Sequence, residues 1–191
     1  MSSTELAAGQ RQRLLEVAEW AIRNALREGR CPAPVPDEFP EALRQPRASF
    51  VTLKRHGRLR GCIGSLDPRR PLVDDVAENA CAAAFRDPRL PPLSLPELEG
   101  LAIEISLLTL PEPMNFESEA DLIRQLEPGR DGLILKEGGR RGTFLPAVWK
   151  SLPEPRAFLD QLKLKAGLAP DDWSDTIRIE RYRTESFAGD I

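Results

Sequence analysis

The sequence predicts an α+β fold built on a mainly antiparallel β-sheet with flanking helices. Two hairpins, at residues 48–66 and 132–145, supply neighbouring antiparallel strands. Amphipathic helical segments lie before, between and after them, at residues 6–26, 71–85 and 156–166. Hairpins that alternate with helices are typical of α+β folds around an antiparallel sheet. The sequence contains no internal repeat.

The length and composition of the chain fit one globular domain, or one domain with two lobes. A chain of 191 residues can bury a sizeable core. Its 41% hydrophobic and 30% charged residues are ordinary for globular proteins and disfavour disordered and fibrous classes. No apolar run approaches the roughly 20 residues of a membrane span, and the N-terminus lacks the pattern of a secretory signal. We therefore expect a cytoplasmic protein without a membrane segment.

Charge and cysteine usage narrow the classes of partner. A net charge of -3 gives no global attraction to nucleic acid, and 6% aromatic residues offer little surface for base stacking. The basic stretch from Lys54 to Arg70 holds an anionic ligand or is a solvated hairpin tip. Cys31, Cys62 and Cys81 are odd in number and far apart, which disfavours a disulfide framework or a CxxC metal site. We expect no resident metal or cofactor and no nucleic-acid partner.

The first half of the chain begins with a helix and a stiff connector. Residues 6–26 carry apolar side chains at three- and four-residue steps, and Gly29 marks the end of that helix. The prolines of residues 31–36 predict an extended connector. A second helix follows Pro71 over residues 72–85, with a small-residue face suited to close packing on a sheet.

The first hairpin contains the most unusual stretch of the chain. Residues 48–54 alternate as a strand, His56-Gly57 makes the turn, and residues 59–66 return as the partner strand. In regular alternation, Arg60 and Cys62 share one face of that strand.

The sequence of the second half predicts two further strands, a hairpin and helices. Ser94 and Glu97 cap a helical turn, and residues 101–110 form the clearest strand. A short helix begins at Ser118 and ends near Gly129. After the second hairpin, the expected elements are a helix start at 146–150, a helix at 156–166 and a last strand at 176–184.

The stretch Leu59 to Leu66 places a cysteine between two glycines. Gly61 and Gly64 let another group approach the backbone closely, and Ser65 follows them. A cleft that presents backbone amides and one thiol would use these residues, and Arg60 beside Cys62 would favour a thiolate. The alternative is that Cys62 is a buried, inert, small apolar residue.

Few side chains are available to activate Cys62 as a nucleophile. His56, the only histidine, lies at the turn and some 20 Å along an extended chain from Cys62, which disfavours a Cys–His dyad. Multi-histidine zinc sites are excluded. Phosphate-binding glycine loops of the GxxxxGK[ST] or GxGxxG type are missing.

Five stretches together resemble the AMMECR domain family, whose bacterial and archaeal members are labelled AmmeMemoRadiSam system protein A. They begin at Leu59 (LRGCIG), Asp87 (DPRLPP), Arg141 (RGTFLP), Lys165 (KAG) and Arg181 (RYR). The match covers nearly the whole chain in the right order, and the LRGCIG string is the most specific part. Leu90 departs from the aromatic residue that the family usually shows after the Asp-x-Arg triplet, which weakens any claim of ring stacking there.

The resemblance implies a fold, a site and partners. It implies a single domain over residues 1–191 with two unequal lobes, a cleft between them, and residues 59–64 near that cleft. It also implies an association with a Memo-like protein and a radical SAM protein. Its hallmark positions are Arg60, Gly61, Cys62, Ile63 and Gly64, with Thr143, Leu145 and Pro146 as a second segment.

Two functions from different classes fit these residues. The first is an accessory or small-ligand-binding component that works with the Memo-like and radical SAM partners. The second is an enzyme in which Cys62 attacks a small anionic or carbonyl substrate that Arg60 holds. In either case, the expected ligand-binding residues are Gly61, Ile63, Gly64, Ser65, Thr143, Leu145 and Pro146.

Overall fold

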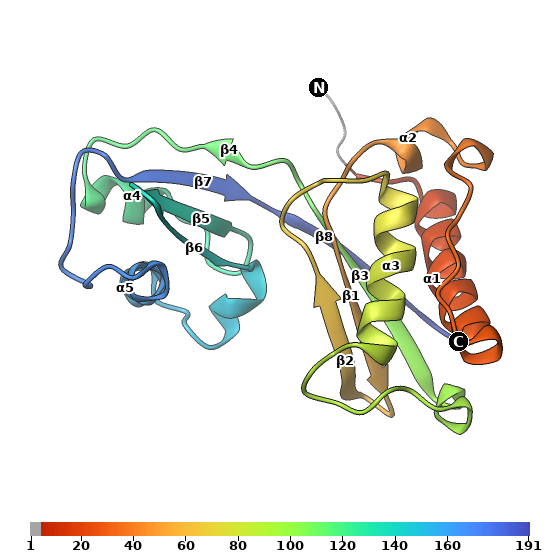
Figure 1. The fold of residues 1–191 in the computed structure, drawn as a ribbon. Helices are drawn as coiled ribbons and strands as arrows, with labels where there is room; N and C mark the ends of the chain where they lie inside the picture. Colours follow the sequence, from red (N-terminus) through yellow and green to blue (C-terminus); the bar gives the residue numbers. More distant parts are fainter. Residues whose placement is uncertain (1–4) are drawn as a thin grey trace. The chain divides into compact units, whose positions relative to one another are not determined.

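The structure, a computed structural model, describes residues 5–191 and contains two compact units. The first unit comprises the chain up to Leu108 together with Glu185–Ile191, and the second is Thr109–Thr184. Each unit contains an antiparallel four-stranded sheet with helices packed on it (Figure 1). The predicted α+β class is therefore confirmed, although the sequence pattern does not divide the strands between two sheets.

The first sheet has the strand order β2-β1-β3-β8. Its strands are β1 (Ser49–Arg55), β2 (Arg58–Gly64), β3 (Leu101–Leu108) and β8 (Thr184–Asp190). The central strand β1 pairs antiparallel with β2 and β3, so the first predicted hairpin is confirmed. Strand β8 was not expected from the sequence, because the strand predicted over 176–184 belongs mostly to β7 (Arg178–Tyr182) in the other sheet.

Helices α1 (Ala8–Glu28) and α3 (Leu72–Phe85) cover one face of the first sheet (Figure 1). Strands β1 and β3 alternate buried and partly exposed side chains, as expected when one face packs on a core. Helix α1 ends where the sequence predicts, since Gly29 takes a positive φ of 70° and its amide donates to the Ala25 carbonyl at 2.9 Å. The core between helices and sheet includes Leu14, Ile22, Val51, Leu53, Leu72, Val76, Ile103 and Ile105.

Short helical segments shape the loops of the first unit. The connector is extended only up to Val35, because η1 (Pro36–Glu38) and α2 (Glu41–Arg44) follow at once. The predicted capped turn is η2 (Leu95–Leu98), where the Ser94 amide and hydroxyl both donate to the Glu97 carboxylate at 2.8 Å.

A buried polar cluster fixes α3 on β1. The Asp75 carboxylate accepts from the Ser49 hydroxyl at 2.6 Å, from the Ser49 amide at 3.0 Å and from Asn79 Nδ2 at 3.0 Å. Burial raises the pKa of Asp75, and these donors act in the opposite direction. Every partner of this carboxylate is part of the fold, so the cluster positions the start of β1 rather than a ligand.

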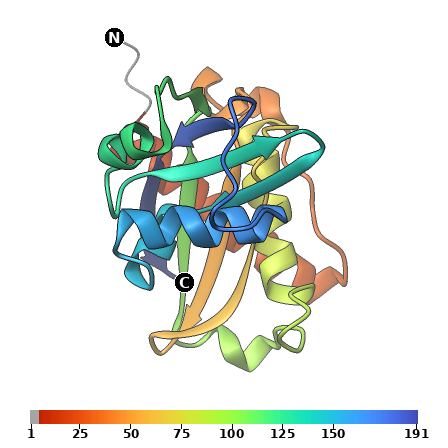
Figure 2. The same ribbon diagram turned by 90° about the vertical axis from the view of Figure 1, so that its left-hand side faces the viewer.

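The second unit carries the sheet order β4-β7-β5-β6. Besides β7, its elements are β4 (Glu112–Pro113), α4 (Glu119–Gln125), β5 (Gly132–Glu137), β6 (Arg140–Phe144), η3 (Pro146–Lys150) and α5 (Pro155–Ala166). The second predicted hairpin is β5–β6, and α5 runs across those strands (Figure 2). Helix α4 begins at the Ser118 cap as expected but ends before Gly129, which lies in a turn.

Aromatic side chains close the core of the second unit. The Trp149 ring stacks on Phe158 with centroids 3.8 Å apart, and the Trp149 Nε1 donates to the Asp131 carbonyl at 2.7 Å. This contact fixes η3 against the strand β5 that follows Asp131. Unit 2 therefore has a hydrophobic core of its own.

Candidate functional site

Strand β2 contains a β-bulge at Arg60, which changes the expected geometry of the LRGCIG stretch. Leu53 of β1 faces Gly61 and Lys54 faces Leu59, so Arg60 is the extra residue. The bulge interrupts the strict alternation from which a shared face of Arg60 and Cys62 was predicted. Beyond it, Cys62 lies opposite Thr52, on the face of the sheet that α1 and α3 do not cover.

The two glycines of the stretch are explained by close packing. A Cβ atom on Gly61 would lie 2.0 Å from the Ala83 carbonyl oxygen, because α3 packs directly on β2 at this point. A Cβ atom on Gly64 would lie 2.3 Å from the Phe50 ring and 2.5 Å from the Ser49 carbonyl oxygen. Neither glycine has a positive φ, so the close approach of neighbouring groups is the reason for both.

Cys62 is partly exposed rather than a buried core residue. Its Sγ lies 3.2 Å from the Thr52 hydroxyl on the neighbouring strand. Its amide donates to Asp87 Oδ2 at 3.0 Å, and its carbonyl accepts from Arg89 Nη2 at 3.3 Å. The residue is therefore partly accessible, whereas its own amide and carbonyl are already hydrogen-bonded.

Asp87 and Arg89 clamp the loop after α3 onto β2. The Asp87 carboxylate, 1% exposed, accepts from Arg89 Nη2 at 2.6 Å and Nε at 2.9 Å. The hydrogen bonds from the Arg89 side chain, followed by the Cys62 amide, hold the pKa of Asp87 well below its usual range. This ionised carboxylate positions the Cys62 backbone and offers no base for proton abstraction.

The charge of Arg60 is engaged within the first unit. Its Nε and Nη2 donate to the two carboxylate oxygens of Glu97 at 2.7 and 3.0 Å, and its Nη1 donates to the Pro91 carbonyl at 3.0 Å. The Arg60 hydrogen bond lowers the pKa of Glu97 to about 2, so the pair stays charged over the physiological range. With only 8% of its surface exposed, Arg60 joins β2 to the segment around η2.

The remaining candidate positions of the first unit have local roles. The half-buried Ile63 packs against the core of α1, α3 and the sheet. The Ser65 amide donates to the Ser49 carbonyl at 3.1 Å, and its hydroxyl accepts from the Asp67 amide at 3.1 Å. Ser65 thus closes the turn that follows β2.

Thr143, Leu145 and Pro146 belong to the second unit, at the junction of β6 and η3. The Thr143 hydroxyl donates to the Leu133 carbonyl at 2.8 Å and lies 3.4 Å from the Tyr182 hydroxyl. Leu145 is the half-buried residue before η3, and Pro146 is its buried first residue. The expected position of residues 59–64 at a cleft between two lobes stays a prediction.

The face of the first sheet opposite α1 and α3 carries a polar row next to Cys62. Thr52 lies between Cys62 on β2 and Glu104 on β3. The Lys54 ammonium pairs with the Glu104 carboxylate, and the Ser106 hydroxyl lies 2.8 Å from that of Ser186 on β8. We call Cys62, Thr52, Lys54, Glu104 and Ser106 the polar sheet face. Sequence analysis missed it, although the alternation that buries Val51 and Leu53 also places Thr52 and Lys54 on the opposite side.

The side chains provide no obvious metal-binding or general-base chemistry around Cys62. Within residues 5–191, no group of three or more histidine, cysteine, aspartate or glutamate side chains is arranged to hold a metal ion. His56 is exposed at the hairpin turn, at the opposite end of β2 from Cys62. Among the described helices, none is both long and apolar enough to cross a membrane.

Comparisons with known proteins agree on one family. The AMMECR1 family model matches residues 15–187. A protein of Methanothermobacter thermautotrophicus is 39% identical over 196 residues, covering all of both chains. One from Thermococcus gammatolerans is 39% identical over 185 residues and covers 91% of this chain and 87% of its own. The crystal structure of the uncharacterized protein PH0010 from Pyrococcus horikoshii matches with a TM-score of 0.78 at 36% identity, covering 92% and 89% of the two chains.

Proposed function

We propose, on the premise that this chain belongs to the AMMECR1 family, that it is a non-catalytic accessory component. In this proposal, it works with a Memo-like protein and a radical SAM protein, and it binds a small polar ligand or its partners through the polar sheet face. The observation that carries the proposal is the engagement of Arg60 by Glu97 and Pro91. Arg60 donates three of its five N–H groups to these two residues and is only 8% exposed, so it has little capacity left to hold a substrate anion.

The backbone around Cys62 supports the same proposal. An enzyme that acts through Cys62 needs donors aimed at the oxygen where charge develops and a base for the thiol. The Cys62 amide already donates to Asp87, and the sulfur of Cys62 contacts the Thr52 hydroxyl at 3.2 Å. Neither group supplies an effective base, because the lowered pKa of Asp87 makes its carboxylate a very weak proton acceptor and a hydroxyl is also a weak one.

The polar sheet face has the chemistry of a recognition surface. It combines a thiol, two hydroxyls and the Lys54–Glu104 ion pair on three adjacent strands. Adjacent strands hold these groups in a fixed pattern, which favours specific hydrogen bonding over strong electrostatic attraction. Lys54 and Glu104 are 43% and 33% exposed in their side chains, so both are accessible for contacts.

A charge swap tests this surface while the ion pair is retained. The double variant Lys54→Glu/Glu104→Lys keeps opposite charges in place but reverses the pattern offered to a partner. We expect binding to the Memo-like or radical SAM protein of the same organism to weaken by about ten-fold. The same swap of another cross-strand pair, Lys136→Glu/Glu180→Lys on β5 and β7, is the matched control and should leave binding unchanged. If the wild-type chain binds neither partner, the accessory role is overturned.

The enzyme alternative rests on one specific observation, the partial exposure of Cys62. Here Cys62 acts as a nucleophile on a small anionic or carbonyl substrate. Cys62→Ser keeps the size and hydrogen bonding of the side chain and removes most of its nucleophilicity. The accessory role predicts that this variant binds partners within about three-fold of wild type. Loss of a partner-dependent reaction with unchanged partner binding would favour the enzyme.

A further inference from the structure

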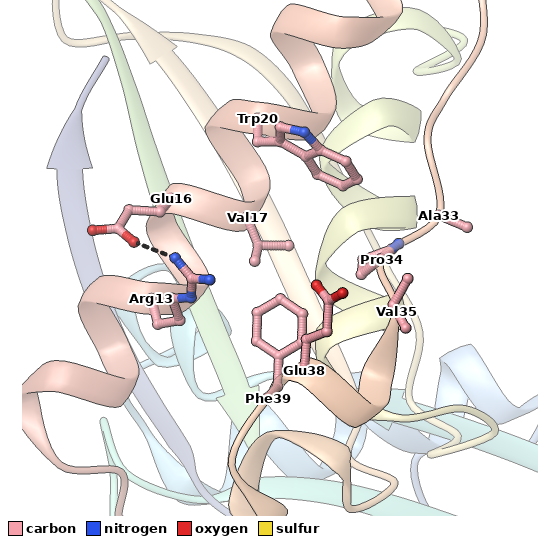
Figure 3. Close-up of a pocket in the computed structure, with 9 residues that line it drawn as sticks. All are labelled: Arg13, Glu16, Val17, Trp20, Ala33, Pro34, Val35, Glu38 and Phe39. Carbon is pink, nitrogen blue, oxygen red and sulfur yellow. Dashed lines mark hydrogen bonds and ion pairs between the residues drawn. The ribbon is translucent and has the colours of Figure 1, made fainter.

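A pocket on the first unit lies apart from the polar sheet face, between α1 and the proline-rich connector. Its volume is about 390 Å³, which falls within the range of small-molecule sites. The α1 side is formed by Arg13, Glu16, Val17 and Trp20, and the connector side by residues 33–35 with Glu38 and Phe39 (Figure 3). The prolines of the connector restrict its backbone, so the wall opposite α1 is stiff.

Aromatic and apolar side chains make most of this pocket's lining. Trp20 is 40% exposed although it is large and apolar, and Val35 is 55% exposed. Phe39 is half-buried, and Val17 forms a buried floor. Exposed aromatic rings around a concavity offer π faces that attract organic cations as well as apolar groups.

The chain already places a cation on one of these rings. The Arg13 guanidinium carbon lies 5.2 Å from the centroid of the Phe39 ring, and Arg13 Nη1 pairs with Glu16 Oε2 at 3.2 Å. One aromatic ring and one carboxylate of the pocket thus hold a cation that belongs to the chain itself. The Trp20 ring and the Glu38 carboxylate line the same pocket, and no cation of residues 5–191 is placed over that ring or paired with that carboxylate.

Glu38 leaves the pocket with an uncompensated negative charge. Among residues 5–191, its carboxylate has no hydrogen bond or ion pair, whereas Glu16 is neutralised by Arg13. Figure 3 shows the Glu38 carboxylate directed into the pocket beside the Phe39 ring. Its neighbour Asp37 pairs with Arg44 at 3.7 Å and does not line the pocket.

We propose that this pocket binds a small organic cation, an ammonium or guanidinium group on an apolar body. The charged group lies between the Trp20 ring and the Glu38 carboxylate, and the apolar body lies along Val17, Pro34 and Val35. The inference does not depend on the proposed accessory function, because no residue of the polar sheet face contributes to it.

Choline and 3,3-dimethyl-1-butanol test the charge requirement directly, since the two probes have nearly the same shape and only choline is cationic. The full chain is titrated with each probe while the indole N–H signals of its three tryptophans are followed by NMR. The signal that disappears in Trp20→Phe identifies Trp20. We expect choline to shift the Trp20 signal and leave those of Trp149 and Trp173 in place, and we expect the alcohol to bind at least about five-fold more weakly.

Two matched variants locate the charge that matters. Glu38→Gln removes the carboxylate and should weaken choline binding by about five-fold. Asp37→Asn makes the same charge change one residue away, on a side chain that is 94% exposed, and should have no effect. Equal binding of choline and the alcohol would overturn the proposal, and so would equal weakening by both variants or a choline shift that persists unchanged in Glu38→Gln.

Discussion

Arg60 and Glu97 form a two-pronged ion pair, with Nε to Oε1 at 2.7 Å and Nη2 to Oε2 at 3.0 Å. The pair connects the bulge of β2 to the segment around η2, and the Pro91 carbonyl accepts a third hydrogen bond from the same guanidinium. Arg60 therefore holds the strand that carries Cys62 against the segment around η2, and its main role is to stabilise the fold.

Replacement of Arg60 should destabilise the fold more than loss of a surface charge does. Arg60→Ala leaves Glu97 Oε1 and the Pro91 carbonyl without their Arg60 donor, and we expect a loss of about 2 kcal/mol in the free energy of unfolding. Arg60→Lys keeps the charge but cannot form the fork, so about half of that loss should remain. Chemical denaturation measures both. Arg58→Ala, an exposed arginine on the same strand, is the control, and equal effects at the two positions would contradict the role of the pair.

Acidification should weaken the first unit through Glu97. Its pKa falls from 4.5 in the unfolded chain to about 2 in the folded protein, so the ionised form stabilises the fold. That stability is fully present above pH 4.5 and is lost as the pH falls toward 2. In Glu97→Gln, the slope of unfolding free energy against pH in this window should be shallower than in the wild type. An unchanged slope would show that other carboxylates account for acid unfolding.

Gly61→Ala should be among the most damaging single substitutions on β2. The added methyl group would lie 2.0 Å from the Ala83 carbonyl oxygen. Neither atom can move away alone, because the backbone of β2 fixes the methyl group and the backbone of α3 fixes the carbonyl group. We expect at least about 3 kcal/mol of destabilisation or a failure to fold. Gly139→Ala places the same methyl group in open space without a positive φ, and it should be tolerated. Thermal unfolding of the two variants distinguishes packing from a general intolerance of glycine replacement.

The single tyrosine provides an optical test of the second unit. Burial raises the pKa of Tyr182 to about 12. Its hydroxyl donates to the Phe144 carbonyl at 2.9 Å. Because the folded state holds the proton more tightly than the unfolded state, stability should fall as the pH rises from 10 toward 12. Phenolate absorbance should appear with unfolding rather than before it. A titration near pH 10 in the folded protein would mean that Tyr182 is exposed.

The three cysteines should react with iodoacetamide in the order of their exposure. Cys31 is exposed, Cys62 is partly exposed and Cys81 is fully buried in α3. Burial also raises the pKa of the Cys81 thiol, which lowers its thiolate fraction further. Mass spectrometry of single-cysteine modification over time should place Cys62 between the other two. If Cys62 reacts as slowly as Cys81, it is a packing residue, and the accessible surface proposed around it is incorrect.

Local patterns in the sequence predicted most helices and hairpins, but they did not predict which residues contact one another in the fold. Period and capping signals located α1, α3, α5 and both hairpins, because those signals depend on residues a few positions apart. The Arg60 bulge could not be predicted, since a register shift leaves no local pattern and the Glu97 partner of Arg60 lies 37 residues away in the sequence. Asp87 is the first residue of one family-like stretch, and its contact with the Cys62 amide, 25 residues away in the sequence, follows only from the fold.

The pocket between α1 and the connector could not be predicted from the sequence either. Trp20 fitted an amphipathic helix and residues 31–36 fitted a connector, and neither pattern indicates a concavity. The pocket exists because the connector turns back along α1 and η1 presents Glu38 and Phe39 to it. Such sites depend on the path of a loop in three dimensions, which a short stretch of sequence does not encode in isolation.

The insertion of Thr109–Thr184 between β3 and β8 has a consequence for the order in which the chain folds. The partners Ser106 and Ser186 are 80 residues apart, and closing such a loop costs about 2 kcal/mol more than closing a short hairpin. The ends of the insertion are paired with each other, since the Thr109 amide donates to the Arg183 carbonyl at 2.8 Å and the Arg183 amide donates to the Thr109 hydroxyl at 2.8 Å. When the inserted unit folds first, it brings β3 and β8 together as a hairpin turn would. The final strand then adds to its sheet with little further loss of chain entropy.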